Sequence, residues 1–156
     1  MTRSPLALAL VVAATVSPPG RADDPPPAVR VTVVVVLAGP ADKGVDPRLA
    51  ALAEEVRKKD KTLVGFRIAG TASKSILVGS SQEFALVDDQ SLSVAVKKPK
   101  DADGRVGLTI SPPGLGDITY SCTCGKYFPV VTPYKTATGE QLIVAVMGKP
   151  CTGGKK

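Results

Sequence analysis

The sequence predicts an α+β fold in which one amphipathic helix packs on a mostly antiparallel β-sheet or sandwich that starts with a β-α-β unit. Residues 29–38 (VRVTVVVVLA) form a short run rich in β-branched residues, which favours a strand buried on both faces and placed in the middle of a sheet. A helical pattern at 47–58 and a second apolar run at 63–69 follow, as in a strand, a crossover helix and a parallel strand. Short strands then recur at even spacing between turn residues, which is typical of an antiparallel meander or sandwich.

The N-terminus has the layout of a secretory signal peptide. Arg3 precedes an apolar segment at 6–16, and small residues occupy the third and first positions before a cut after Ala22. The apolar segment is too short to span a bilayer, and no later stretch reaches about 18 consecutive apolar residues. We therefore expect a signal peptide at 1–22, a Pro-rich lead-in at 23–27, a single domain at 28–152, a frayed tail at 153–156, and no transmembrane segment in the mature chain.

The helix is predicted from the residues at its two ends and from its apolar spacing. Asp46 suits the N-cap, Pro47 suits the first helical position, and basic residues crowd the last turn, where the helix dipole favours them. The apolar residues recur at three- and four-residue spacing, which gives one stripe that should lie on the sheet. These residues are Leu49, Leu52, Ala53 and Val56.

The remaining strands are predicted from short apolar runs between turn signals. They are 76–78, 84–87, 92–96, 106–110, 118–122, 127–134 and 141–147. Residues 70–75 are expected to form a polar turn, and residues 88–90 (DDQ) a hairpin turn. Gly114 and Gly116 do not have the spacing of a dinucleotide-binding or phosphate-binding loop, so they are interpreted as part of a turn between strands.

The last hairpin predicts a disulfide bond. If Ala137 and Thr138 are its two turn residues, Val131 faces Val144 and Val130 faces Ala145. The same register places Cys124 opposite Cys151, close to disulfide range. Pro129 and Pro133 cannot donate hydrogen bonds to a ladder, so their strand should lie at a sheet edge.

The three cysteines are the only reactive constellation in the sequence. Export favours a disulfide between Cys124 and Cys151, which leaves Cys122 as a possible free thiol. Cys122 and Cys124 are two residues apart on one strand and share a face, so Cys122 is an alternative partner in the disulfide. The weaker alternative is a soft-metal site, such as one for copper(I), made of all three thiolates.

Other chemistry has little support in the sequence. The chain has no histidine, which excludes Ser-His-Asp and Cys-His catalysis and imidazole metal sites. Asp88 with Asp89, and Asp101 with Asp103, are better explained as turn residues than as calcium ligands or an acid-base pair. Residues 73–75 (SKS) invite a Ser-Lys nucleophile interpretation that no local signature supports. We expect no cofactor and no catalytic residue.

The charge is mildly basic. The chain has 20 Lys and Arg against 14 Asp and Glu, a net charge of +6. Loss of Arg3 and Arg21 with the signal peptide leaves 18 against 14, or +4. Basic clusters at 57–61 and 97–100 suit either solvated helix ends and hairpin tips or a patch for a polyanion. Export and the modest charge argue against a nucleic-acid partner.

Five segments carry a family resemblance: the signal peptide, the VVVV run at 33–36, DPRL at 46–49, GFR at 65–67 and CGKYFPVVT at 124–132. In these segments the chain resembles small exported proteins of planctomycete bacteria that have no assigned activity. The resemblance implies export and a single domain, and it supplies no catalytic residue.

Together these observations predict an exported, non-enzymatic binding or structural module of the periplasm or cell envelope. Its partner would be another envelope protein or a polyanion. The alternative is a cysteine-based soft-metal carrier or a cysteine redox protein.

Overall fold

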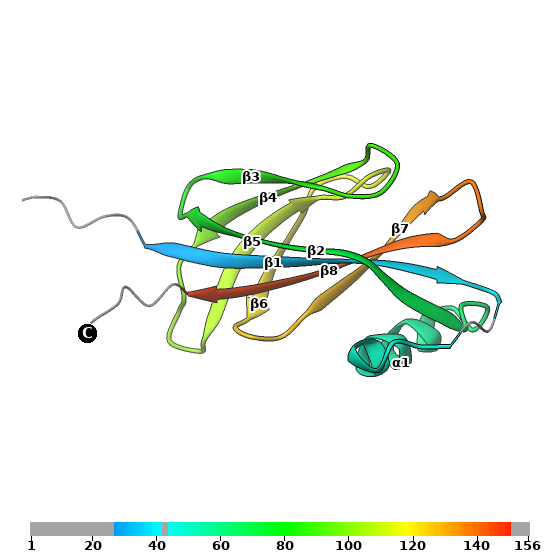
Figure 1. Cartoon of the computed structure of the whole chain (residues 1–156). Coiled ribbons are helices and arrows are strands. Elements are labelled where there is room, and N and C mark those ends of the chain that lie inside the picture. Colours follow the sequence, from blue (N-terminus) through cyan, green and yellow to red (C-terminus); the bar gives the residue numbers. More distant parts are fainter. Residues whose placement is uncertain (1–26, 42–43, 151–156) are drawn as a thin grey trace, which may run out of the picture.

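The computed structural model describes residues 27–41 and 44–150, and these residues form two antiparallel β-sheets and one short α-helix (Figure 1). The elements are β1 (Ala28–Gly39), a 3-10 turn (Pro47–Leu49), α1 (Ala50–Lys59), β2 (Gly65–Leu77), β3 (Ser81–Ala85), β4 (Ser91–Lys98), β5 (Arg105–Ser111), β6 (Ile118–Thr123), β7 (Phe128–Lys135) and β8 (Gln141–Pro150). One sheet has the order β2-β1-β8-β7 and the other β3-β4-β5-β6. The prediction of a β-rich, mostly antiparallel fold with one helix is confirmed.

β1 lies between β2 and β8 in the first sheet, as predicted for the Val-rich run. Its first half alternates in burial, whereas Val34 to Gly39 are all buried. The change occurs because the odd-numbered residues face the second sheet throughout, while the even-numbered residues meet α1 only at this end. A strand covered on both faces needs apolar residues at consecutive positions.

The predicted β-α-β start is wrong, because β1 and β2 pair antiparallel from Ala28↔Leu77 to Gly39↔Gly65. A parallel pairing would require the connection to return along the whole length of β1. The 12 residues of β1 span about 40 Å, whereas the 10 residues of α1 span about 15 Å. The helix therefore stays at one end of the sheet, and the chain re-enters the sheet in the opposite direction.

β2 is one long strand, not two short strands separated by a turn at 70–75 as predicted. The polar residues Thr71 and Ser73 suggested a turn, but they lie on an edge strand and are exposed to solvent. The register shifts opposite Val35 and Val36, so the strand continues through an irregularity. An edge strand with a solvated face has no need for apolar alternation.

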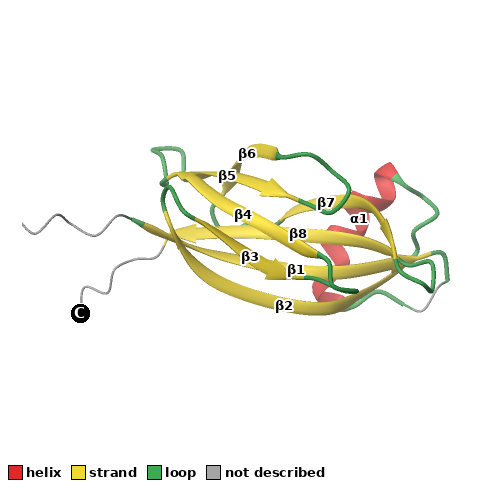
Figure 2. Cartoon of the chain, turned by 90° about the horizontal axis from the view of Figure 1, so that it is seen from above, coloured by secondary structure: helices red, strands yellow, loops and turns green. Residues whose placement is uncertain are grey.

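Two apolar clusters stabilise the fold. The larger cluster lies between the two sheets and contains residues from every strand, including Val33, Leu108 and Val144. The smaller cluster lies on the outer face of the first sheet, under α1. Figure 2 shows α1 on the side of this sheet that faces away from the second sheet. Three predicted stripe residues, Leu49, Ala53 and Val56, are buried there, and Leu52 packs against the cluster at its border. No helix in the described part of the chain is long and apolar enough to cross a membrane.

Candidate functional site

An open apolar groove lies on the outer face of the first sheet, beside α1. It has a volume of about 410 Å³. Its lining residues come from β1, the helical segment, β2, the β6–β7 turn, β7 and β8. They are Val34, Arg48, Leu49, Ala51, Leu52, Ile68, Thr71, Lys126, Tyr127, Pro129 and Ala145. A volume of this size is typical of small-ligand sites, which are concave and mostly apolar with a few polar groups.

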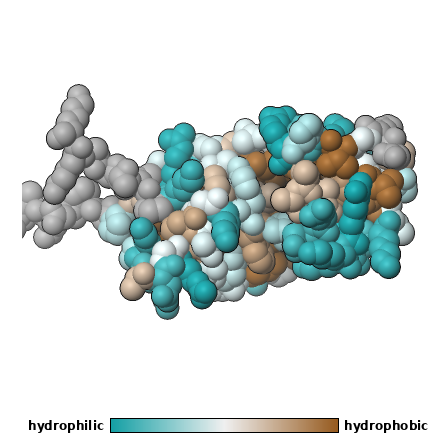
Figure 3. Space-filling model, turned by 90° about the horizontal axis from the view of Figure 1, so that it is seen from below, coloured by the Kyte–Doolittle hydropathy of each residue, from teal (hydrophilic) through white to brown (hydrophobic). Residues whose placement is uncertain are grey.

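The groove exists because α1 is too short to cover the sheet. The helical segment comprises the 3-10 turn and α1. Its Leu49 is buried against the sheet, whereas Leu52, at the border of the apolar stripe, is only partly buried and faces the groove. Tyr127 forms part of the opposite wall at the start of edge strand β7 and is 46% exposed. Figure 3 views the molecule from below, and apolar surface appears toward one end while the rest is mostly pale or hydrophilic.

Two cationic side chains line the groove, and no described lining residue is acidic. Arg48 is held by Asp46, which accepts hydrogen bonds from its Nε and Nη2 at 3.1 and 2.8 Å. These bonds, together with one from the Arg48 backbone N–H, lower the pKa of Asp46 to about 2. Asp46 is thus the predicted cap, although it caps the 3-10 turn. Lys126 makes no ion pair with the described residues, so it is the unneutralised charge of the groove.

Cys122 and Cys124 both belong to the end of the sandwich where β6 leaves the sheet. Cys122 is 3% exposed within the central core, and Cys124 packs against that core. Neither forms a disulfide with another residue in the described part of the chain. Burial raises the pKa of the Cys122 thiol, which opposes formation of the nucleophilic and metal-binding thiolate.

The predicted pairing of Cys124 with Cys151 rests on a register that is off by one residue. Val130 faces Val144 and Val131 faces Ile143, and the register shifts again before Lys135↔Gln141. The turn is longer than two residues, since the Thr136 N–H donates to the Glu140 carbonyl and Gly139 has a φ of +83°. This moves the register by one residue, and the irregularity between Val131 and Lys135 then moves it by two residues in the opposite direction. Cys151 lies outside the described residues, so the disulfide stays a prediction. The edge position of β7 is confirmed.

The Ser-Lys interpretation of residues 73–75 finds no matching geometry. The Ser73 hydroxyl hydrogen-bonds to Thr32 Oγ1 at 2.8 Å. The Lys74 ammonium instead donates to the Glu83 carbonyl and lies 5.2 Å from the centre of the Phe84 ring. Lys74 therefore joins β2 to β3 across the side of the sandwich.

The acidic pairs are turn residues, as their sequence context predicted. Asp88 and Asp89 have φ of +52° and +60°, and the Gln90 N–H donates to the Val87 carbonyl at 3.0 Å. Asp101 accepts from the backbone N–H groups of Asp103 and Arg105, both at 2.9 Å. Gly114 has a φ of +73° and also belongs to a turn, in which the Leu115 N–H donates to the Pro112 carbonyl. In the described residues no group of three or more Cys, Asp or Glu side chains could hold a metal ion.

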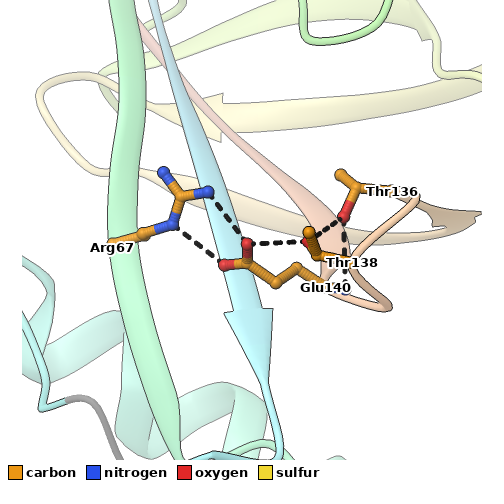
Figure 4. Close-up of polar contacts among 4 residues, drawn as sticks. All are labelled: Arg67, Thr136, Thr138 and Glu140. Atoms are coloured by element: carbon orange, nitrogen blue, oxygen red, sulfur yellow. Dashed lines mark hydrogen bonds and ion pairs between the residues drawn. The ribbon is translucent and has the colours of Figure 1, made fainter.

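A second hollow, lined by polar and apolar residues, lies beside the β7–β8 turn and contains Arg67 and Thr138. Arg67 donates to both carboxylate oxygens of Glu140 at 2.9 Å (Figure 4). Thr138 Oγ1 donates to the same carboxylate at 3.2 Å. Glu140 thus neutralises the Arg67 charge, and the network fixes the turn against β2.

No protein-family model matches this chain, and neither a curated protein nor a solved structure is similar to it. The resemblance to planctomycete exported proteins therefore stays an expectation. The site is defined by the fold alone: an apolar groove on the helix-bearing face of two stacked antiparallel sheets.

Sequence reasoning missed the groove, because its residues come from separate strands, the helical segment and a turn, and the sequence does not show how these elements are arranged. Two signals pointed toward it. Leu52 belongs to the helix stripe, and Tyr127 precedes the strand that its prolines place at an edge.

Proposed function

We propose that this protein is an exported, non-enzymatic binding module of the periplasm or cell envelope, and that the groove beside α1 is its binding site. The observation that carries the proposal is the apolar lining, which is open to solvent, whereas most other large apolar side chains in the described residues are buried. Exposed apolar surface in a concave site is a mark of ligand or partner binding. The signal peptide pattern supports the export part of the proposal.

The cysteine-based alternative has less support. A carrier or redox protein needs accessible thiolates, whereas Cys122 is buried and its pKa is raised. Cys122 instead packs as a small apolar residue in the central core.

The groove can be tested by filling it. Thr71 lines the groove from β2 and is exposed, so Thr71→Trp places a large ring there while keeping a residue that strands accept. Thr119→Trp on edge strand β6 is the matched control, because Thr119 is exposed on the other sheet. The readout is binding of the neutral fluorescent probe N-phenylnaphthylamine.

The wild-type protein and Thr119→Trp should bind the probe with equal affinity. Thr71→Trp should weaken binding by about tenfold or more, equivalent to about 1.4 kcal/mol. Absence of binding by the wild-type protein, or equal binding by Thr71→Trp, contradicts the assignment of the groove.

A further inference from the structure

The outer face of the first sheet changes from apolar to basic along one direction. On β8 the outward residues run from Ile143 and Ala145, which are buried, through Met147, which is partly buried, to Lys149, which is exposed. Ala145 and Lys149 are four positions apart, which corresponds to about 13 Å of extended strand. The groove lies at the apolar end of this series, since Ala145 lines it.

The basic end carries two like charges in register. Arg30 on β1 faces Lys149 on β8, and both side chains are exposed. Like charges directly opposite each other on neighbouring strands are destabilising unless something neutralises them. Neither residue forms an ion pair with the described part of the chain. An anion bound between them would relieve the repulsion.

A third cation lies near the same pair. The turn between β6 and β7 contains Gly125 and Lys126, and Lys149 Cε would lie 3.6 Å from a Cβ placed on Gly125. Lys126 also lines the groove, so the basic end and the apolar end are contiguous. The outward residues of the intervening row are Ser73, Thr32 and Met147, none of which is acidic.

We infer that this face binds an anionic amphiphile, with its alkyl chain in the groove and its carboxylate or phosphate head group at Arg30 and Lys149. The inference rests on the proposed binding function of the groove and adds the chemical class of the ligand. Charge complementarity identifies the head group: no described residue forms an ion pair with these cations, and no carboxylate occurs in the described exposed rows of β1, β2 and β8 on this face. The apolar lining identifies the tail.

The test compares decanoate, decyl phosphate and the neutral decanol by calorimetry at low salt and below the concentration at which they form micelles. Met147 lies midway along the proposed path and is the one methionine in the described residues, so a ¹³C-methyl methionine label reports occupancy by NMR. The variant is Arg30→Gln/Lys149→Gln. The control is Lys97→Gln/Lys100→Gln, which removes two exposed charges elsewhere.

At least one of the two anions should bind about tenfold more tightly than decanol and shift the Met147 methyl signal. The Arg30→Gln/Lys149→Gln variant should lose this advantage and keep its affinity for decanol, whereas the control should behave as wild type. Binding of decyl phosphate alone would point to a phospholipid source, and binding of decanoate alone to a fatty acid.

The failures of the two proposals are distinguishable. Equal affinity for decanol and both anions, or an anion advantage that survives in Arg30→Gln/Lys149→Gln, overturns the inference and leaves the groove function intact. No binding of any of the three, together with no binding of the neutral probe, overturns both. If the protein sediments with anionic lipid vesicles but none of the three single-chain ligands shifts the Met147 methyl signal, the inference is wrong, and this face binds a membrane surface instead.

Discussion

Tyr120 on β6 stacks on Phe128 on β7, with ring centroids 4.1 Å apart and an interplanar angle of 23°. β6 is an edge of one sheet and β7 is an edge of the other, so this pair closes one side of the space between the sheets. The Tyr120 hydroxyl is buried and has no hydrogen-bond partner among the described residues. The pair thus combines a favourable ring contact with an unsatisfied polar group.

Removal of the Tyr120 hydroxyl should not lower the free energy of unfolding, whereas removal of the ring contact with Phe128 should. Tyr120→Phe keeps the stack and should leave the free energy of unfolding unchanged or raise it by up to about 1 kcal/mol. Phe128→Ala should lower it by about 1 to 2 kcal/mol, a modest loss because Phe128 is 38% exposed. Urea denaturation measures both. Tyr127→Ala is the control, and an equal loss there would contradict a specific role for the stack.

The same tyrosine makes stability fall at alkaline pH. Burial raises the pKa of Tyr120 above its ordinary value of 10.0, so the unfolded chain releases the phenolic proton before the folded chain does. The folded state is therefore unaffected below pH 10 and loses stability as the pH rises above it.

Tyr120→Phe should remove this contribution. Its stability advantage over the wild type should grow above pH 10 by up to about 1.4 kcal/mol for each pH unit. Urea denaturation of the wild type and of Tyr120→Phe, at intervals of about one pH unit from pH 8 to 11, measures the difference in free energy of unfolding. A difference that stays constant over this range would show that Tyr120 titrates in the folded state as it does in the unfolded state.

The cysteines should differ in reactivity. Cys122 is buried and its thiol pKa is raised, so iodoacetamide should modify it only after denaturation. If Cys124 pairs with Cys151, the denatured protein should show one reactive thiol without reductant and three with it. Intact mass spectrometry of protein from its native compartment gives the count and also shows whether the chain begins at Asp23. Three reactive thiols without reductant would contradict the disulfide.

The helix and the central strand were predictable because their signals are local. Asp46 and Pro47 mark the start of the helical segment by their own chemistry, and the Val-rich run reports burial on two faces. The direction of β2 was not predictable in this way, because a helix between two strands is compatible with either pairing. Only the length of α1 relative to β1 distinguishes the two, and the boundaries of both elements are what a sequence predicts least well.

The groove and the basic end of this face, with Arg30 and Lys149, could not be predicted from local sequence signals. Arg30 and Lys149 are 119 residues apart, and their juxtaposition follows from the pairing of β1 with β8. A shift of one residue in that pairing would place different residues opposite each other and turn outward residues inward. The predicted register of β7 against β8 was wrong by one residue, which shows how sensitive such inferences are to turn length and to irregularities along a strand.

The β3–β4 turn offers a stabilising substitution. Asp88 and Asp89 both have positive φ, which is the geometry of a type I′ turn and favours glycine, most often at the second position. Asp89→Gly should raise the free energy of unfolding by about 0.3 to 1 kcal/mol by relieving the left-handed conformation. Asp88→Gly should gain less, because Asp88 Oδ2 accepts a hydrogen bond from the Tyr134 hydroxyl at 3.0 Å. Urea denaturation of the two variants measures the difference, and a larger gain for Asp88→Gly would show that the bond to Tyr134 contributes nothing to stability.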